Sequence, residues 1–116
     1  MCAQRVFQLH QHLQPADGDP IRSIVAETAH ASIVAWHVAP GQRIAAHVHP
    51  HGQDSWTVIS GAGLYQVDAD GHTVPIAAGD IVVAPMGAVH GVVNHGAQPL
   101  IFVSVVSPAE AGFQPL

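Results

Sequence analysis

Three histidines, His47, His49 and His51, lie within five residues of one another. Successive side chains of a β-strand point to opposite faces, so His47 and His49 would face the same side, with their backbones about 6–7 Å apart. Zinc binds imidazole nitrogen at about 2.0–2.1 Å, a distance that two such side chains can satisfy together. The stretch therefore predicts a shared metal ion, and the rest of the chain must support it, because a His-x-His pair alone also occurs by chance.

Histidine is unusually common, with ten in 116 residues. Neutral imidazole is the commonest metal ligand, and histidine is also the usual acid–base group near neutral pH. A purely structural protein has little reason to concentrate so many. We therefore expect a few of them to carry the chemistry and the rest, such as His95, to lie in turns or on the surface.

The charge balance disfavours nucleic acid as a partner, because phosphate binding needs basic side chains. Only three arginines (Arg5, Arg22 and Arg43) and no lysine stand against eight acidic residues. No apolar run approaches the ~20 residues that span a bilayer, and no apolar signal region opens the chain. The one cysteine, Cys2, excludes an internal disulfide framework, and we expect it to be a bystander. We therefore expect a cytoplasmic protein without a membrane partner.

Short apolar runs separated by Gly, Pro and Asp-Gly turns recur along the chain, and no helical period survives among them. Asp70-Gly71 predicts a hairpin, and Pro75 suits an edge strand because it cannot donate to a ladder. The pattern predicts an all-β sandwich or barrel in one domain. We expect about nine strands and expect the one at 81–84 to be buried. The predicted strands include 5–9, 23–28, 32–38, 64–68, 72–76, 81–84, 88–93 and 100–106.

Two spaced motifs stand out. In the first, Gly41 is followed after five residues by His47-x-His49, after four more by Asp54, and after six more by Gly61. This pattern resembles the first of two stretches typical of the cupin family, in which the acidic residue is usually Glu. Here it is Asp54, one methylene shorter.

In the second motif, Gly79 is followed after five residues by Pro85-x-Gly87, after two more by His90, and after three more by Asn94. It matches the second cupin stretch completely. The chain is therefore similar to a small single-domain, RmlC-like cupin over about residues 30–107. We expect one domain over 1–116, with an N-terminal arm at 1–20 and a loose C-terminal tail at 108–116.

The resemblance implies a double-stranded β-helix, or jelly roll, with one divalent transition metal (Fe, Mn, Ni, Zn or Cu) inside its open end. It implies His47, His49, the acidic residue and His90 as the ligands. Counting back from Gly61 gives Asp54 as the fourth ligand, whereas counting forward from His49 with the family's shorter spacing gives Gln53. Asp54 is the preferred reading, and Gln53 stays the alternative.

Several further side chains are candidates for the pocket. Arg43 has the same strand parity as His47 and His49, so it could hold a carboxylate, or else lie on the surface. His51 could be a substitute ligand or an exposed loop residue. Core packing is the alternative explanation for the aromatic candidates. The full set of expected wall residues is Trp36, Arg43, His51, Trp56, Tyr65, Met86 and Phe102.

The function favoured by the resemblance is that of a metal-dependent enzyme acting on a small molecule. Dioxygenase chemistry is the first expectation, with lyase or isomerase chemistry as further possibilities. The alternative is a non-catalytic module that binds a carboxylate or a sugar. A homodimer is expected both from the family and from the need to cover edge strands.

Overall fold

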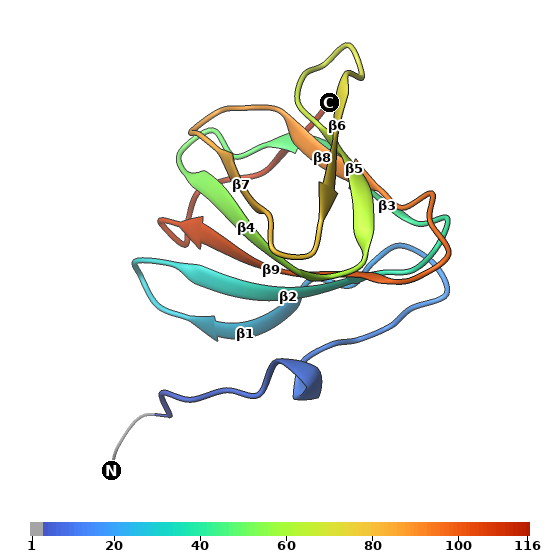
Figure 1. Ribbon diagram of the computed structural model, residues 1–116. Helices are drawn as coiled ribbons and strands as arrows, with labels where there is room; N and C mark the ends of the chain where they lie inside the picture. The colour runs from blue at the N-terminus through green and yellow to red at the C-terminus, as the bar shows by residue number, and fades with distance from the viewer. Residues whose placement is uncertain (1–3) are drawn as a thin grey trace.

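The structure is a computed structural model that describes residues 4–116 (Figure 1), so Cys2 lies outside the described residues. Almost all of its regular structure is β-strand. Among the described residues no helix is long and apolar enough to cross a lipid bilayer. The elements are η1 (Leu9–Gln11), β1 (Ser23–Glu27), β2 (Ser32–Val38), β3 (Arg43–Val48), β4 (Gln53–Ser60), β5 (Ala62–Gln66), β6 (Thr73–Ala77), β7 (Ile81–Ala84), β8 (His90–Val93), β9 (Leu100–Ser107) and β10 (Gln114–Pro115).

The strands form two five-stranded sheets, in which every recorded pair is antiparallel. One sheet has the order β1-β2-β9-β4-β7, and the other has the order β10-β3-β8-β5-β6. Consecutive strands β3 and β4 belong to different sheets, so the chain crosses between the layers there (Figure 1). The predicted all-β architecture is confirmed.

The core lies between the inner faces of the two sheets. Phe102 of β9 is fully buried and stacks on Trp56 of the neighbouring strand, with ring centroids 4.1 Å apart. Trp56 in turn meets Tyr65 of the opposite sheet edge to face, at 5.1 Å. Such aromatic contacts stabilise a core beyond the apolar area they bury. The buried cluster consists of Val38, Trp56, Val58, Tyr65, Ile76, Val92, Leu100 and Phe102.

The turn chemistry explains most strand boundaries. Strands β5 and β6 pair as the predicted hairpin, with Asp68 accepting hydrogen bonds from the backbone of Asp70 and of His72. Pro75 lies on β6, which is the edge strand of its sheet, as expected. The expectation of a buried strand at 81–84 is wrong: Ile81 and Val83 are exposed, because β7 is also an edge strand and shows its outer face to solvent.

The N-terminal arm does not form the strand expected at 5–9. Residues 4–8 are irregular and lead into the single turn η1, none of whose residues is buried. Figure 1 shows this arm running outside β1, away from the barrel. Its later part is fixed by Gln42, whose side-chain amide donates to the carbonyls of Ala16 and Gly18 at 2.6 Å each.

The C-terminal tail is not the loose end that the sequence suggested. Gln114 and Pro115 form β10, which pairs with Val48 and His47 of β3. Ala111 is buried, and its carbonyl accepts a hydrogen bond from the backbone of His51 at 2.8 Å. The tail therefore closes one edge of the second sheet beside the first motif.

Exposed apolar side chains gather on the outer face of the first sheet. Val83 and Val105 flank Ser55 from the two strands that pair with β4, and both are exposed. Ile81 lies farther along the same edge and is 71% exposed. The homodimer expected from the sequence stays a prediction, and these side chains are where substitutions would test it.

The link between β4 and β5 yields a stability prediction. Gly61 has a φ of 80°, and a Cβ there would lie 2.1 Å from the carbonyl oxygen of Pro99. Gly71 has a similar φ of 88°, but nothing lies within 4 Å of its added Cβ. Both alanine variants incur the left-handed penalty, and we expect Gly61→Ala to lose about 1–3 kcal/mol more free energy of unfolding than Gly71→Ala. Urea titration measures the difference, and equal losses would contradict this account.

Candidate metal centre

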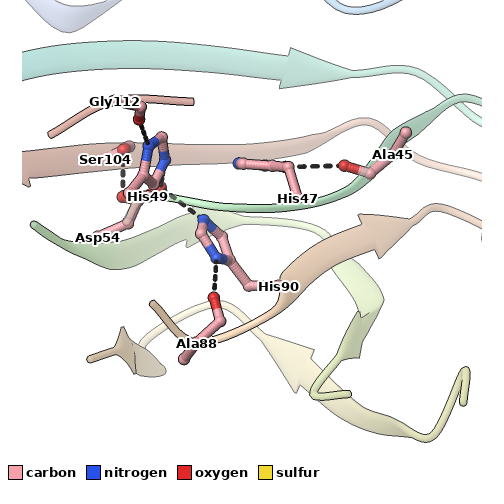
Figure 2. A network of polar contacts seen from close by, with 8 residues as sticks. All are labelled: Ala45, His47, His49, Asp54, Ala88, His90, Ser104 and Gly112. Carbon is pink, nitrogen blue, oxygen red and sulfur yellow. Dashed lines mark hydrogen bonds and ion pairs between the residues drawn. The ribbon is translucent and has the colours of Figure 1, made fainter. Parts of the chain in front are cut away.

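Four side chains from both sheets meet at one end of the barrel. The ligand atoms of His47, His49, Asp54 and His90 all lie within 4.8 Å of one another. His47 on β3 pairs directly with His90 on β8, His49 follows just after β3, and Asp54 comes from β4 of the other sheet. Figure 2 shows the rings gathered around the Asp54 carboxylate. His90 is 36 positions from Asp54 in the sequence. The pairing of β8 with β3 and the packing of the two sheets bring it to the other three residues.

Asp54, not Gln53, faces the histidines. Burial alternates along β4, so that Asp54, Trp56 and Val58 point inward. Gln53 lies on the exposed outer face of the same strand. Asp54 is only 5% exposed, and His47 and His90 are similarly buried at 6% and 1%. Strand alternation therefore removes Gln53 from the candidate ligands in this structure.

Each imidazole is oriented through its Nδ1 atom (Figure 2). His47 Nδ1 lies 2.8 Å from the carbonyl oxygen of Ala45, and His90 Nδ1 lies 3.1 Å from that of Ala88. His49 Nδ1 lies 2.7 Å from the carbonyl oxygen of Gly112, in the C-terminal tail. A carbonyl can only accept, so each Nδ1 carries a proton. In neutral rings this leaves every Nε2 with a free lone pair.

The Nε2 atoms face a group that also cannot donate. His90 Nε2 lies 3.1 Å and His49 Nε2 3.5 Å from Asp54 Oδ2. An ionised carboxylate only accepts hydrogen bonds, so lone pairs face lone pairs unless a cation lies among them. A proton on one ring would bridge one pair of atoms, whereas a metal ion would accept all of these lone pairs. The donor set therefore fits a divalent transition metal held by imidazole nitrogens and one carboxylate.

The Asp54 carboxylate is held ionised. Burial alone would raise its pKa, but the hydrogen bond from Ser104 and those that His49 and His90 donate when their rings are protonated outweigh burial and lower the pKa well below its usual range. Ser104 donates its hydroxyl proton to Asp54 Oδ1 over 2.5 Å. This bond occupies one carboxylate oxygen and leaves Oδ2 turned to the histidines. Such outer contacts orient metal ligands.

Two of the histidines are shifted in opposite directions. Burial lowers the pKa of His47, which favours the neutral ring that binds a metal. The hydrogen bond to Asp54 raises the pKa of His49, so a proton competes with a metal for this ring. As the pH falls toward the His49 pKa, His49 becomes protonated. A metal ion that binds under these conditions must displace this proton.

A cavity of about 500 Å³ borders His47, His49 and Asp54. This volume lies within the range of small-molecule sites, which is about 300–1,000 Å³. Its walls are mainly apolar and come from β2, β3, β9 and the C-terminal tail. The remaining lining residues are Arg22, Val34, Trp36, Ile44, Ala45, Trp56, Ser104, Val106, Ala109, Ala111, Gly112 and Phe113.

Among the aromatic candidates, Trp36 and Trp56 line this cavity. Tyr65 and Phe102 do not; both belong to the buried core. Phe102 stacks between the two tryptophans, at 6.2 Å from Trp36 and 4.1 Å from Trp56. Phe102 therefore supports the cavity wall from behind.

Arg43 does not line the cavity, and the parity argument for it is wrong. A register shift separates Ile44 from His47 on β3, so one extra residue reverses the faces within the strand. Ile44 packs against the core and lines the cavity, while Arg43 is exposed and lines another hollow. Sequence alternation cannot anticipate such a bulge.

His51 and Met86 also lie away from the cavity. His51 is exposed, and its recorded contact is the backbone hydrogen bond to Ala111. Met86 is 68% exposed in the turn before His90. That turn is nevertheless close to the centre, because the backbone N–H of Gly87 donates to the carbonyl of His49 at 3.0 Å. The second motif thus braces the first through its backbone.

Sequence reasoning missed the contribution of the tail and of Arg22. The ring of Phe113 lies 5.1 Å from that of His47 and 6.4 Å from that of His49, and it forms part of the cavity wall. No local pattern in the tail marks this return to the centre. Arg22 could have been found by extending the alternation of the next strand, since Ile24 pairs with the cavity residue Val34.

A second group of side chains with metal-binding atoms lies in the β5–β6 hairpin, at Asp68, Asp70 and His72. Asp68 accepts hydrogen bonds there from the backbone of Asp70 and from both the backbone and the ring of His72. These bonds shape the turn. The group is explained by the hairpin and adds nothing to the metal centre.

The hydroxyl of Ser104 gives a test of the ligand geometry. Ser104→Ala removes the hydrogen bond to Asp54 with little change in volume, and outer-sphere partners typically change metal affinity by about 10–100-fold. We expect zinc affinity, measured by competition with a chromophoric chelator, to fall about tenfold. The matched control is Ser107→Ala on the same strand, whose hydroxyl donates to His30 outside the centre. Equal zinc affinities in the two variants would disprove the role assigned to Ser104.

Comparison with known proteins agrees with this architecture. Residues 34–106 match the family described as Cupin domain. A crystal structure of a Klebsiella pneumoniae protein with a double-stranded β-helix domain is 50% identical, covers 97% of both chains and has a TM-score of 0.94. The structure of KdgF from a Halomonas species is 25% identical, covers 91% of this chain and 94% of that chain, and has a TM-score of 0.77.

Among curated proteins, the alginate biosynthesis protein AlgA of Pseudomonas aeruginosa is 32% identical over 75 residues. The match covers 65% of this chain but 15% of that protein, so the chain spans a small part of this relative. The family match over 34–106 takes in both motifs and most strands of both sheets. With two packed sheets in the double-stranded β-helix arrangement, the chain belongs to the cupin family.

Proposed function

We propose that the protein is a metal-dependent enzyme acting on a small molecule. One divalent transition metal (Fe, Mn, Ni, Zn or Cu) would be held by His47, His49, Asp54 and His90. The observation that supports this most is the set of Nε2 lone pairs turned to a buried carboxylate, each ring fixed by a carbonyl on its Nδ1. The adjoining cavity supplies room for a substrate beside three of these residues.

When bound, such an ion polarises a carbonyl or lowers the pKa of a bound water, and iron(II) also supports dioxygenase chemistry. The chain supplies the surroundings. Trp36, Val106 and Phe113 give the cavity apolar walls, and Ser104 keeps the Asp54 carboxylate turned to the histidines. Dioxygenase chemistry is our first proposal, because three imidazoles with one carboxylate suit iron(II) and the apolar walls suit an organic substrate.

The second candidate is a non-catalytic module that binds a carboxylate or a sugar in the same cavity. The similarity to part of an alginate biosynthesis protein supports the sugar version. The two candidates differ in turnover. A ligand that raises the melting temperature of the metal-loaded protein, yet leaves the solution unchanged after long incubation, would favour the binding module over the enzyme.

The decisive experiment combines metal content with oxygen uptake. Elemental analysis of the isolated protein identifies the ion, and an oxygen electrode with a catechol, a thiol or a diketone detects turnover. We expect His90→Ala to lose both the metal and the activity, because His90 is 1% exposed and its Nε2 lies 3.1 Å from Asp54. His90→Gln, which keeps more of the volume, should show the same losses in a folded protein.

The matched control is His95→Ala, which removes an exposed histidine from the turn after β8. This variant should keep the metal and the activity of the unaltered protein. Activity retained in metal-free His90→Gln would refute the proposed mechanism. Absence of any transition metal in the isolated protein, together with failure to bind one on addition, would refute the metal centre itself.

A further inference from the structure

We propose that the cavity takes a small monoanion with an apolar body, and that Arg22 is the specificity-determining residue that binds its anionic group. The proposal deepens the function proposed above and rests on it in one respect, because the same cavity would hold the substrate of the metal centre.

Arg22 lies on the cavity side of the first sheet. It precedes β1 by one residue, and two residues later Ile24 pairs with Val34, which also lines the cavity. The Arg22 side chain itself forms part of the lining together with His49 and Asp54. The guanidinium is therefore placed in the same cavity as three of the proposed metal ligands.

The Arg22 guanidinium has only a weak ion-pair partner among the described residues. Its recorded ion pair is with Glu27, where Nη2 and Oε2 lie 3.9 Å apart and both side chains are about half exposed. An exposed ion pair at that distance contributes little. Glu27 also accepts a hydrogen bond from Ser32. Within residues 4–116 no hydrogen bond from the Arg22 guanidinium to a protein group is recorded, so its planar donors are available for a carboxylate or similar anion.

Arg22 is also the one cation among the residues that line this cavity. Arg43 lines a different hollow, and Arg5 lies in the exposed N-terminal arm. The chain as a whole carries a formal net charge of −5. A chain with a net negative charge thus presents one of its three arginines beside the proposed reaction site.

The rest of the cavity favours an apolar body on the ligand. Val34, Trp36, Val106 and Phe113 line the same cavity as Arg22, His47 and His49. Phe113 is 64% exposed and its ring centroid lies 5.1 Å from that of His47, where a bound ligand would cover it. A sugar, which carries hydroxyl groups on all sides, would find few partners on these walls. An aryl or branched-alkyl carboxylate satisfies both the cation and the apolar surface.

The test uses the matched pair 3-phenylpropionate and 3-phenylpropionamide, which have nearly the same shape and differ in charge. Their affinities for the zinc-loaded protein are measured by isothermal titration calorimetry. We expect the carboxylate to bind at least tenfold more tightly than the amide, because hydrogen bonds to charged groups are the stronger ones. Arg22→Gln should abolish this preference, and Arg22→Lys should restore part of it.

Arg43→Gln is the control, because it removes the same charge from outside the cavity, and it should keep the full preference. Equal affinities for acid and amide, or a preference that survives in Arg22→Gln, would overturn the proposal. The titrations are repeated after chelation, with zinc content measured in each sample. An Arg22-dependent preference that persists without zinc supports the anion site even if the metal centre fails, and no carboxylate binding in either state overturns the anion site.

Discussion

A buried carboxylate surrounded by lone pairs is the constraint around which this molecule is arranged. Asp54 can only accept hydrogen bonds, and the Nε2 atoms of His49 and His90 lie 3.5 Å and 3.1 Å from it. Carbonyl groups on the far side of the rings prevent them from turning over without losing their Nδ1 contacts. Ser104 donates one hydrogen bond to the carboxylate. The remaining lone pairs of the carboxylate and the imidazoles would be satisfied by a cation. The geometry and the electrostatics of the centre thus point to the same occupant.

This arrangement depends on the packing between the two layers. Asp54 belongs to one sheet, whereas His47 and His90 belong to the other, so contacts between the sheets, such as that of Trp56 with Tyr65, hold these residues at their spacing. The bulge on β3 is accommodated by Gly91, where a Cβ would lie 2.8 Å from the carbonyl of Ile44. Some motif residues likewise stabilise the backbone and do not contact the metal centre. The buried amide of Asn94, for example, donates to the carbonyls of Val38 and Gln98.

Strand alternation and turn chemistry predict much of this structure because both depend on residues close together in the sequence. They suffice for the β5–β6 hairpin, the extent of β2 and the inward face of β4, and the motif spacing brings the four candidate ligands into one group. They cannot predict features that depend on contacts between distant parts of the chain. The bulge that turns Arg43 outward depends on pairing with β8, the return of the tail depends on an edge left open by β3, and the exposure of Ile81 depends on the position of β7 in its sheet.

The three imidazoles differ in where their Nδ1 partners come from. Ala45 and Ala88 lie two residues before His47 and His90, so those rings are oriented as soon as their own strands form. His49 relies on Gly112, which is 63 residues farther along the chain. During synthesis, a nascent chain whose residues 112–115 are still inside the ribosomal exit tunnel would therefore present an incompletely ordered ligand set. Tight capture of the ion is expected only after Gly112 and β10 have left the tunnel.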